Sequence, residues 1–114
     1  MNMNIFSKIA EWFCYKYKTL TAPRYTARNV ADEPKDIKAG TLYIVIDGDD
    51  PDTIIFKCPC GCNADIYLNL LKDARPNWSF CVNQKGKITI SPSIWRKAGC
   101  KSHFFIRNGK VSWA

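Results

Sequence analysis

Short runs of β-branched and aromatic residues, separated by turn residues, constrain the fold of this 114-residue chain more than any other feature. The runs are Thr41–Ile46, Thr53–Lys57, Asp65–Leu70, Trp78–Val82, Lys87–Ile90, His103–Arg107 and Lys110–Trp113. Asn108-Gly109, between the last two runs, is the strongest short signal for a hairpin turn. Strands at this spacing are typical of a sandwich or small barrel rather than an α/β fold. We therefore predict a mainly β fold: a small antiparallel sandwich or a Rieske-like or zinc-ribbon-like β-domain over residues 40–114.

Residues 1–39 precede this domain and have a different pattern. Apolar residues recur every three or four positions in the first twenty residues, which predicts an N-terminal amphipathic helix. Lys8 and Glu11 interrupt the apolar stretch that a secretory signal needs, so we expect a cytoplasmic protein. No apolar run approaches the roughly 20 residues of a membrane-spanning helix. Residues 21–38 are polar and contain Pro23 and Pro34, which predicts a linker or extended arm.

Four of the six cysteines lie in two tight motifs. The motifs are Cys58-Pro-Cys60-Gly-Cys62 and Cys100-Lys-Ser-His103, separated by 37 residues. Both fall between predicted strands, where hairpin loops hold side chains rigidly. Thiolates and an imidazole converging from two loops favour Zn²⁺. We predict a zinc site drawn from Cys58, Cys60, Cys62, Cys100 and His103. The favoured set is Cys60, Cys100 and His103, completed by one or both of Cys58 and Cys62.

Other roles for the cysteines are less favoured. Disulfides are disfavoured in a cytoplasmic protein. An iron–sulfur cluster is the main alternative to zinc, since Cys100-x2-His103 resembles one ligand box of a Rieske centre. The single histidine excludes a true Rieske cluster, which needs two, but leaves a cluster with three Cys and one His open. Cys14 and Cys81 stand alone and are predicted to be packing residues.

The sequence contains no recognisable catalytic constellation. A phosphate-binding loop, the Gly-x-Ser-x-Gly motif and paired carboxylates are all missing. A catalytic zinc would need an open position and a nearby general base, and neither a second His nor a Glu lies near the two motifs. A structural metal is therefore favoured over a catalytic one, and a protein without enzymatic activity is favoured, while an enzymatic activity stays open.

The net charge of +7 is unevenly distributed. Residues 31–53 carry two basic and seven acidic side chains, a net charge of −5, whereas residues 54–114 carry ten basic and two acidic ones, a net charge of +8. The cysteine-bearing part is thus compatible with an acidic partner, either nucleic acid or an acidic protein surface. Basic and aromatic residues alternate in Trp95-Arg-Lys97, which is typical of single-strand binders and makes nucleic-acid binding an alternative function.

Three motifs, in order, resemble one family of small bacterial and phage proteins, a domain of unknown function. They are Cys58-Pro-Cys-Gly-Cys62, Pro92-Ser-Ile94 and Cys100-Lys-Ser-His-Phe104, and the resemblance covers roughly residues 40–114. The chain departs from the family pattern at Asn63, where Gly is usual, and at Phe56, where His is frequent. Members of this family are often encoded beside genes for bacterial ubiquitin-like conjugation. The resemblance thus implies a protein partner and an accessory metal-bound module in such a pathway.

Overall fold

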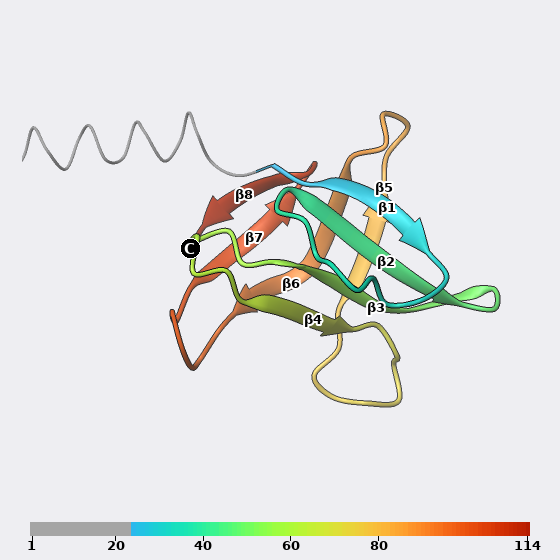
Figure 1. The fold of residues 1–114 in the computed structure, drawn as a ribbon, viewed down its shortest axis with the longest axis horizontal. Helices are drawn as coiled ribbons and strands as arrows, with labels where there is room; N and C mark the ends of the chain where they lie inside the picture. Colours follow the sequence, from blue (N-terminus) through green and yellow to red (C-terminus); the bar gives the residue numbers. More distant parts are fainter. Residues whose placement is uncertain (1–23) are drawn as a thin grey trace, which may run out of the picture.

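The computed structural model describes residues 24–114, which form two four-stranded β-sheets (Figure 1). The N-terminal helix predicted for the first twenty residues, and Cys14 within it, lie outside the described residues. The strands are β1 (Thr26–Val30), β2 (Thr41–Asp47), β3 (Asp50–Lys57), β4 (Asp65–Asn69), β5 (Ser79–Val82), β6 (Ile88–Trp95), β7 (His103–Arg107) and β8 (Lys110–Trp113). One sheet has the order β1-β2-β3-β4 and the other β5-β6-β7-β8. The prediction of a mainly β fold is confirmed.

Pairing within the sheets is antiparallel at every neighbouring pair except one. β1 lies parallel to β2, with Thr26 opposite Thr41 and Val30 opposite Val45, so the first sheet is mixed. We did not predict β1 from the sequence, because it falls in the polar segment expected to be an extended arm. Only Ala27 and Val30 of β1 are partly buried, and the other three residues of the strand are exposed polar ones, so the strand carries little apolar periodicity.

The core lies between the two sheets and draws on both. Leu42, Ile54 and Phe56 point inward from the first sheet, and Ile88, Ile90, Ile94, Phe104 and Ile106 point inward from the second. The rings of Phe56 and Phe104 meet edge to face across the sheets, with centroids 6.3 Å apart. Because inward residues alternate with outward ones, the outer face of the second sheet carries polar and charged residues together with the aromatic side chains of Trp95 and Phe105.

The central strands of the first sheet are buried on both faces, which explains their continuous apolar runs. The outward side chains of Tyr43 and Ile55 pack with Ile37, which belongs to the segment between β1 and β2. The backbone N–H of Lys38 donates to the Tyr43 hydroxyl at 3.3 Å, and the Tyr67 hydroxyl donates to Glu33 at 2.7 Å. The segment of residues 31–40 therefore covers part of the outer face of this sheet.

The described part of the chain, residues 24–114, includes no helix long and apolar enough to span a membrane.

Candidate functional site

Two loops, one from each sheet, meet at one end of the molecule (Figure 1). The loop of residues 58–64 joins β3 to β4 and is closed by a hydrogen bond from the Cys58 N–H to the Ala64 carbonyl, 2.8 Å. Its sharp curl uses Gly61, whose φ of +90° is strained for a residue with a side chain. The loop of residues 96–102 joins β6 to β7 and is closed by the Arg96 N–H donating to the Ser102 carbonyl, 2.8 Å.

The two loops bring four thiols together. The sulfur atoms of Cys58, Cys60, Cys62 and Cys100 all lie within 4.8 Å of one another, so this four-cysteine cluster could hold a metal ion. Cys58 Sγ lies 3.4 Å from Cys60 Sγ and 3.6 Å from Cys100 Sγ. A disulfide needs about 2.05 Å, and all of these cysteines are free. Sulfurs around a tetrahedral ion with metal–sulfur bonds of about 2.3 Å stand about 3.8 Å apart, so the observed spacing fits a tetrahedral site.

The members of the four-cysteine cluster differ in burial and in hydrogen bonding. Cys58 is buried, and this burial raises the pKa of its thiol to about 12. Hydrogen bonding to the Ser102 side chain, 3.2 Å away, and to its backbone lowers the pKa of the exposed Cys100 to about 6. The Arg96 guanidinium donates to Cys62 Sγ at 3.4 Å and to Cys100 Sγ at 3.3 Å. One cation is thus already in place against the negative charge that thiolate ligands would bring.

His103 stands apart from the four-cysteine cluster. As the first residue of β7, it places its side chain on the outer face of the second sheet, where Nε2 lies 2.9 Å from Ser93 Oγ. The imidazole stacks on the indole of Trp95, its cross-strand neighbour, with ring centroids 5.2 Å apart and planes 19° apart. Of the five residues expected to supply metal ligands, the structure therefore brings together the four cysteines and directs His103 to a serine.

A bulge in β6 brings Ser93 to His103. Ile90 pairs with Ile106 and Ile94 pairs with Phe104, so four residue steps on β6 face only two on β7. The extra residues lie in Ser91-Pro92-Ser93, and bulges of this kind re-aim side chains. The backbone carbonyl of Ser93 accepts a hydrogen bond from the indole N–H of Trp78 at 3.3 Å, which anchors the bulge.

The Ser93–His103 pair has the geometry of a nucleophile beside its general base. A serine hydroxyl within about 2.6–3.2 Å of an imidazole nitrogen is the arrangement that activates serine for attack on a carbonyl. Triads add a carboxylate that orients the imidazole. Among residues 24–114, no carboxylate hydrogen-bonds to His103, and the stacked Trp95 is its closest ring contact.

A family model described as "Bacterial ubiquitination-like system serine protease (BubE)" matches residues 29–114. The chain belongs to the BubE family. This places the protein in a family tied to bacterial ubiquitination-like systems, in agreement with the genomic association that the sequence motifs imply. Comparisons with curated proteins and with solved structures found no match.

The family description names a serine protease, and a serine protease needs a serine beside a general base, as in the Ser93–His103 pair. Among the serines that the structure describes, Ser93 alone has a hydrogen-bonding distance to an imidazole nitrogen. Sequence reasoning singled out His103, but as a metal ligand, and it singled out Pro92-Ser93-Ile94 only as part of a resemblance. No spacing rule links residues 93 and 103, because their contact depends on strand register and on the bulge.

Proposed function

We propose that this BubE-family protein is a serine hydrolase that cleaves peptide or isopeptide bonds in a bacterial ubiquitination-like system. The observation that carries the proposal is the 2.9 Å contact between Ser93 Oγ and His103 Nε2. The family description, a serine protease of such a system, supports it independently. This proposal replaces the sequence-based expectation of a non-catalytic zinc-binding accessory module, which becomes one outcome of the test.

The mechanism follows from the roles of the two side chains. Ser93 Oγ attacks the carbonyl carbon of the scissile bond while His103 Nε2 accepts the hydroxyl proton. The imidazolium then returns this proton to the leaving amine as the C–N bond breaks, which leaves an acyl group on Ser93. Water attacks the acyl carbon, His103 accepts the water proton, and the ester bond breaks with the proton returned to Ser93. Ser93 and His103 are both partly exposed on the outer face of the second sheet, where a substrate chain would reach them.

The decisive experiment labels the full chain with a fluorophosphonate probe, which reacts with activated serines. We expect one adduct per chain, located at Ser93 by peptide mass analysis. Ser93→Ala and His103→Gln should reduce labelling by at least about 100-fold, in line with the loss of a nucleophile or its base. Ser91→Ala is the matched control, since it lies on the same bulge and should label as the wild type does. Wild-type labelling in Ser93→Ala would overturn the proposal and favour the non-catalytic module.

We propose in addition that the four-cysteine cluster binds one structural Zn²⁺. Four soft thiol ligands at tetrahedral spacing are the donor set typical of closed structural zinc sites. Bound there, the ion would tie the loop of residues 58–64 to the loop of residues 96–102, which leads directly into His103. Arg96 would offset part of the negative charge of the four thiolates.

Elemental analysis and an absorption spectrum test this metal assignment. We expect one zinc per chain and no visible absorption in protein purified without added metal. Cys100→Ser should lose the metal, whereas Cys81→Ser, which alters an exposed cysteine outside the cluster, should retain it. His103→Gln should also retain it, because the imidazole faces Ser93. Stoichiometric iron with visible absorption would instead establish an iron–sulfur or iron–thiolate centre.

A further inference from the structure

Acidic and basic side chains divide between the two halves of the molecule. Residues 24–73, which include β1–β4, carry nine acidic and six basic side chains, a net charge of −3. Residues 74–114, which include β5–β8, carry eight basic side chains and not one Asp or Glu, a net charge of +8. The Ser93–His103 pair lies in the second half. All charged side chains of this half are basic.

The aromatic and cationic side chains around the pair form a continuous ladder, which we call the basic face. Its members are Lys97, Trp95, His103, Phe105 and Arg107. Lys97 Nζ lies 5.3 Å from the Trp95 ring, and the Arg107 guanidinium lies 4.2 Å from the Phe105 ring. His103 stands between the two aromatic rings, 5.2 Å from Trp95 and 6.2 Å from Phe105. The imidazole is therefore flanked by an aromatic ring and a cation on each side.

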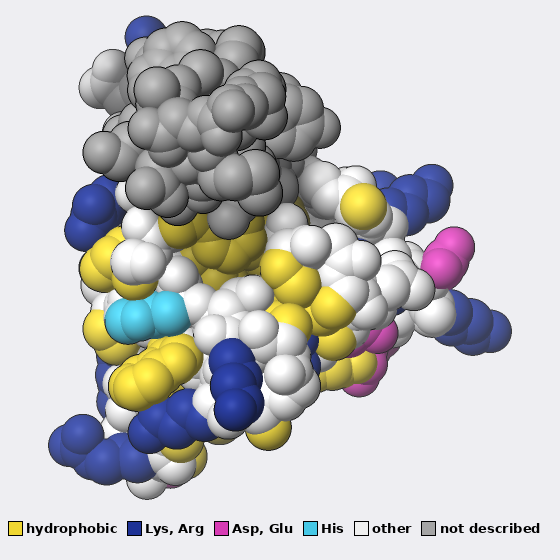
Figure 2. Space-filling model, turned by 90° about the vertical axis from the view of Figure 1, so that its left-hand side faces the viewer, with side chains coloured by type: hydrophobic (Ala, Val, Ile, Leu, Met, Phe, Trp, Pro, Cys, Tyr) yellow, Lys and Arg dark blue, Asp and Glu magenta, His cyan; other side chains and the backbone are white. Residues whose placement is uncertain are grey.

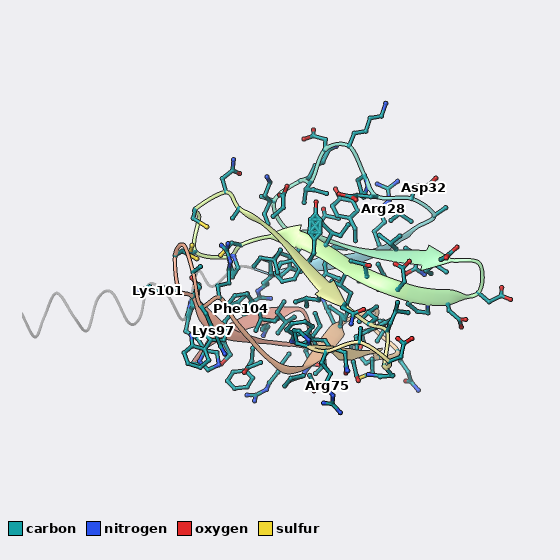
Figure 3. The ribbon with its side chains drawn as sticks, turned by 90° about the horizontal axis from the view of Figure 1, so that it is seen from below. Arg28, Asp32, Arg75, Lys97, Lys101 and Phe104 are labelled. Atoms are coloured by element: carbon teal, nitrogen blue, oxygen red, sulfur yellow. The ribbon has the colours of Figure 1, made fainter. Side chains whose placement is uncertain are left out.

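This arrangement is exposed to solvent. Trp95 is 58% exposed, the largest exposed fraction among the large hydrophobic side chains of residues 24–114. Figure 2 shows the imidazole at the surface, with hydrophobic side chains beside it and Lys and Arg side chains nearby, while the visible Asp and Glu side chains lie away from it. Figure 3 places Lys97 and Lys101 at the end of the molecule where the sulfur atoms gather, and Asp32 in the part that covers the other sheet.

We propose that the basic face binds an acidic, extended polypeptide segment across the Ser93–His103 pair. The proposal rests on the proposed function, because it identifies the kind of substrate segment that this pair would cleave. Arg107 follows His103 by four positions on β7, so their Cα atoms are about 14 Å apart, and its guanidinium lies over Phe105, between these two points. The cations therefore face acidic side chains a few residues from the scissile bond. Lys97 supplies the corresponding charge on the other side, over Trp95.

The ladder itself favours a polypeptide over nucleic acid. Single-strand binders rely on aromatic rings that are free to stack on bases. Here Trp95 is stacked on the imidazole and contacts a lysine, and Phe105 contacts both the imidazole and an arginine. The groups left for recognition are cationic head groups and exposed ring edges, which suit carboxylates on a chain with apolar neighbours.

Binding is tested separately from hydrolysis with the full chain carrying Ser93→Ala. Fluorescence anisotropy compares a Glu-rich fluorescent peptide with its Gln counterpart of equal length and with a single-stranded DNA oligonucleotide. We expect the Glu-rich peptide to bind most tightly and to weaken as salt rises. Lys97→Glu and Arg107→Glu should each weaken it by about fivefold or more, the upper range for one surface charge. The matched control is Lys35→Glu, which changes net charge equally on the acidic half and should have little effect.

Three results would overturn the proposal: equal binding of the Gln peptide, tighter binding of the oligonucleotide, or an equal loss of binding in Lys35→Glu. Failure of this proposal and failure of the proposed function are distinguishable. Loss of selective binding with intact probe labelling at Ser93 would remove only the acidic-segment proposal. Selective binding without labelling at Ser93 would leave the basic face as a docking surface on a non-catalytic protein.

Discussion

At the residue scale, the contact that matters most for the proposed chemistry is the stack of Trp95 on His103. A base is effective only when its imidazole is held in the orientation that its proton transfer needs. In a triad, a carboxylate provides this orientation, whereas here the indole lies nearly parallel to the imidazole, at 19°. In the proposed mechanism, the ring of Trp95 would therefore position His103, and its large exposed surface leaves it little role in the core.

This contact leads to a prediction for Trp95→Ala. Removing the indole frees the imidazole to rotate, and a small misplacement of a catalytic group costs up to about 100-fold in rate. We expect fluorophosphonate labelling of Ser93 to slow by about 10- to 100-fold. The melting temperature should stay close to the wild-type value, because substitutions at exposed positions usually change stability by about 0.5 kcal/mol or less.

Trp95→Phe is the matched control, since it retains an aromatic ring that can stack on the imidazole. It should recover most of the labelling rate. The imidazole proton resonances of His103 supply a second readout, because loss of the stacked ring should shift them. An Ala variant that labels at the wild-type rate would contradict a positioning role for Trp95.

At the element scale, β6 shows which features a sequence can predict and which it cannot. The strands β7 and β8 agree with the predicted residues, because alternation and the Asn108-Gly109 turn define both their ends and their register. β6 continues to Trp95, well beyond the predicted end at Ile90, because Ser91-Pro92-Ser93 breaks the alternation while the strand goes on as a bulge. That same bulge aims Ser93 at His103.

In the two cysteine loops, too, the sequence predicts some features of the candidate site and not others. The grouping of Cys58, Cys60 and Cys62 could be predicted, since adjacent residues in one short loop lie close together in any fold. The side chain of His103 could not be placed by spacing. Cys100 belongs to the loop, whereas His103 already obeys the in-and-out alternation of β7, with buried Phe104 next to it. The spacing of Cys100 and His103 is typical of a zinc ligand pair. Here, however, β7 begins at His103, so the side chain of His103 follows the strand and not the loop.

At the scale of the whole molecule, the four-cysteine cluster closes one end of the sandwich. Three of its cysteines come from the first sheet's loop of residues 58–64, and Cys100 comes from the second sheet's loop of residues 96–102. Elsewhere the sheets are held by the shared apolar core, including the contact between Phe56 and Phe104. A bound ion would thus cross-link the two sheets at the end from which β7 carries His103.

We predict that metal removal loosens this end without unfolding the sandwich. After treatment with a chelator, the core of both sheets persists, so the far-ultraviolet circular dichroism spectrum should remain that of a β protein. The melting temperature should fall by more than about 10 °C, because a structural zinc site contributes several kcal/mol and each kcal/mol is worth about 4–8 °C in a domain of this size. Labelling of Ser93 should slow in parallel, since the loop of residues 96–102 leads into His103.

Hydrogen exchange locates the effect. Amides of residues 58–64 and 96–103 should exchange faster in the metal-free chain, while those of Phe56 and Ile106, within the core, should keep most of their protection. Adding Zn²⁺ back should restore both protection and labelling.

Complete loss of protection in the core would mean that the ion is required for the whole fold. Unchanged labelling in a chain shown to be metal-free would mean that the four-cysteine cluster and the Ser93–His103 pair are independent. We predict a coupling between these limits. Cys100 lies only three positions before His103, so loosening the loop should disturb the imidazole. The core should persist, because its buried residues come from six strands, with only minor contributions from β1 and β5.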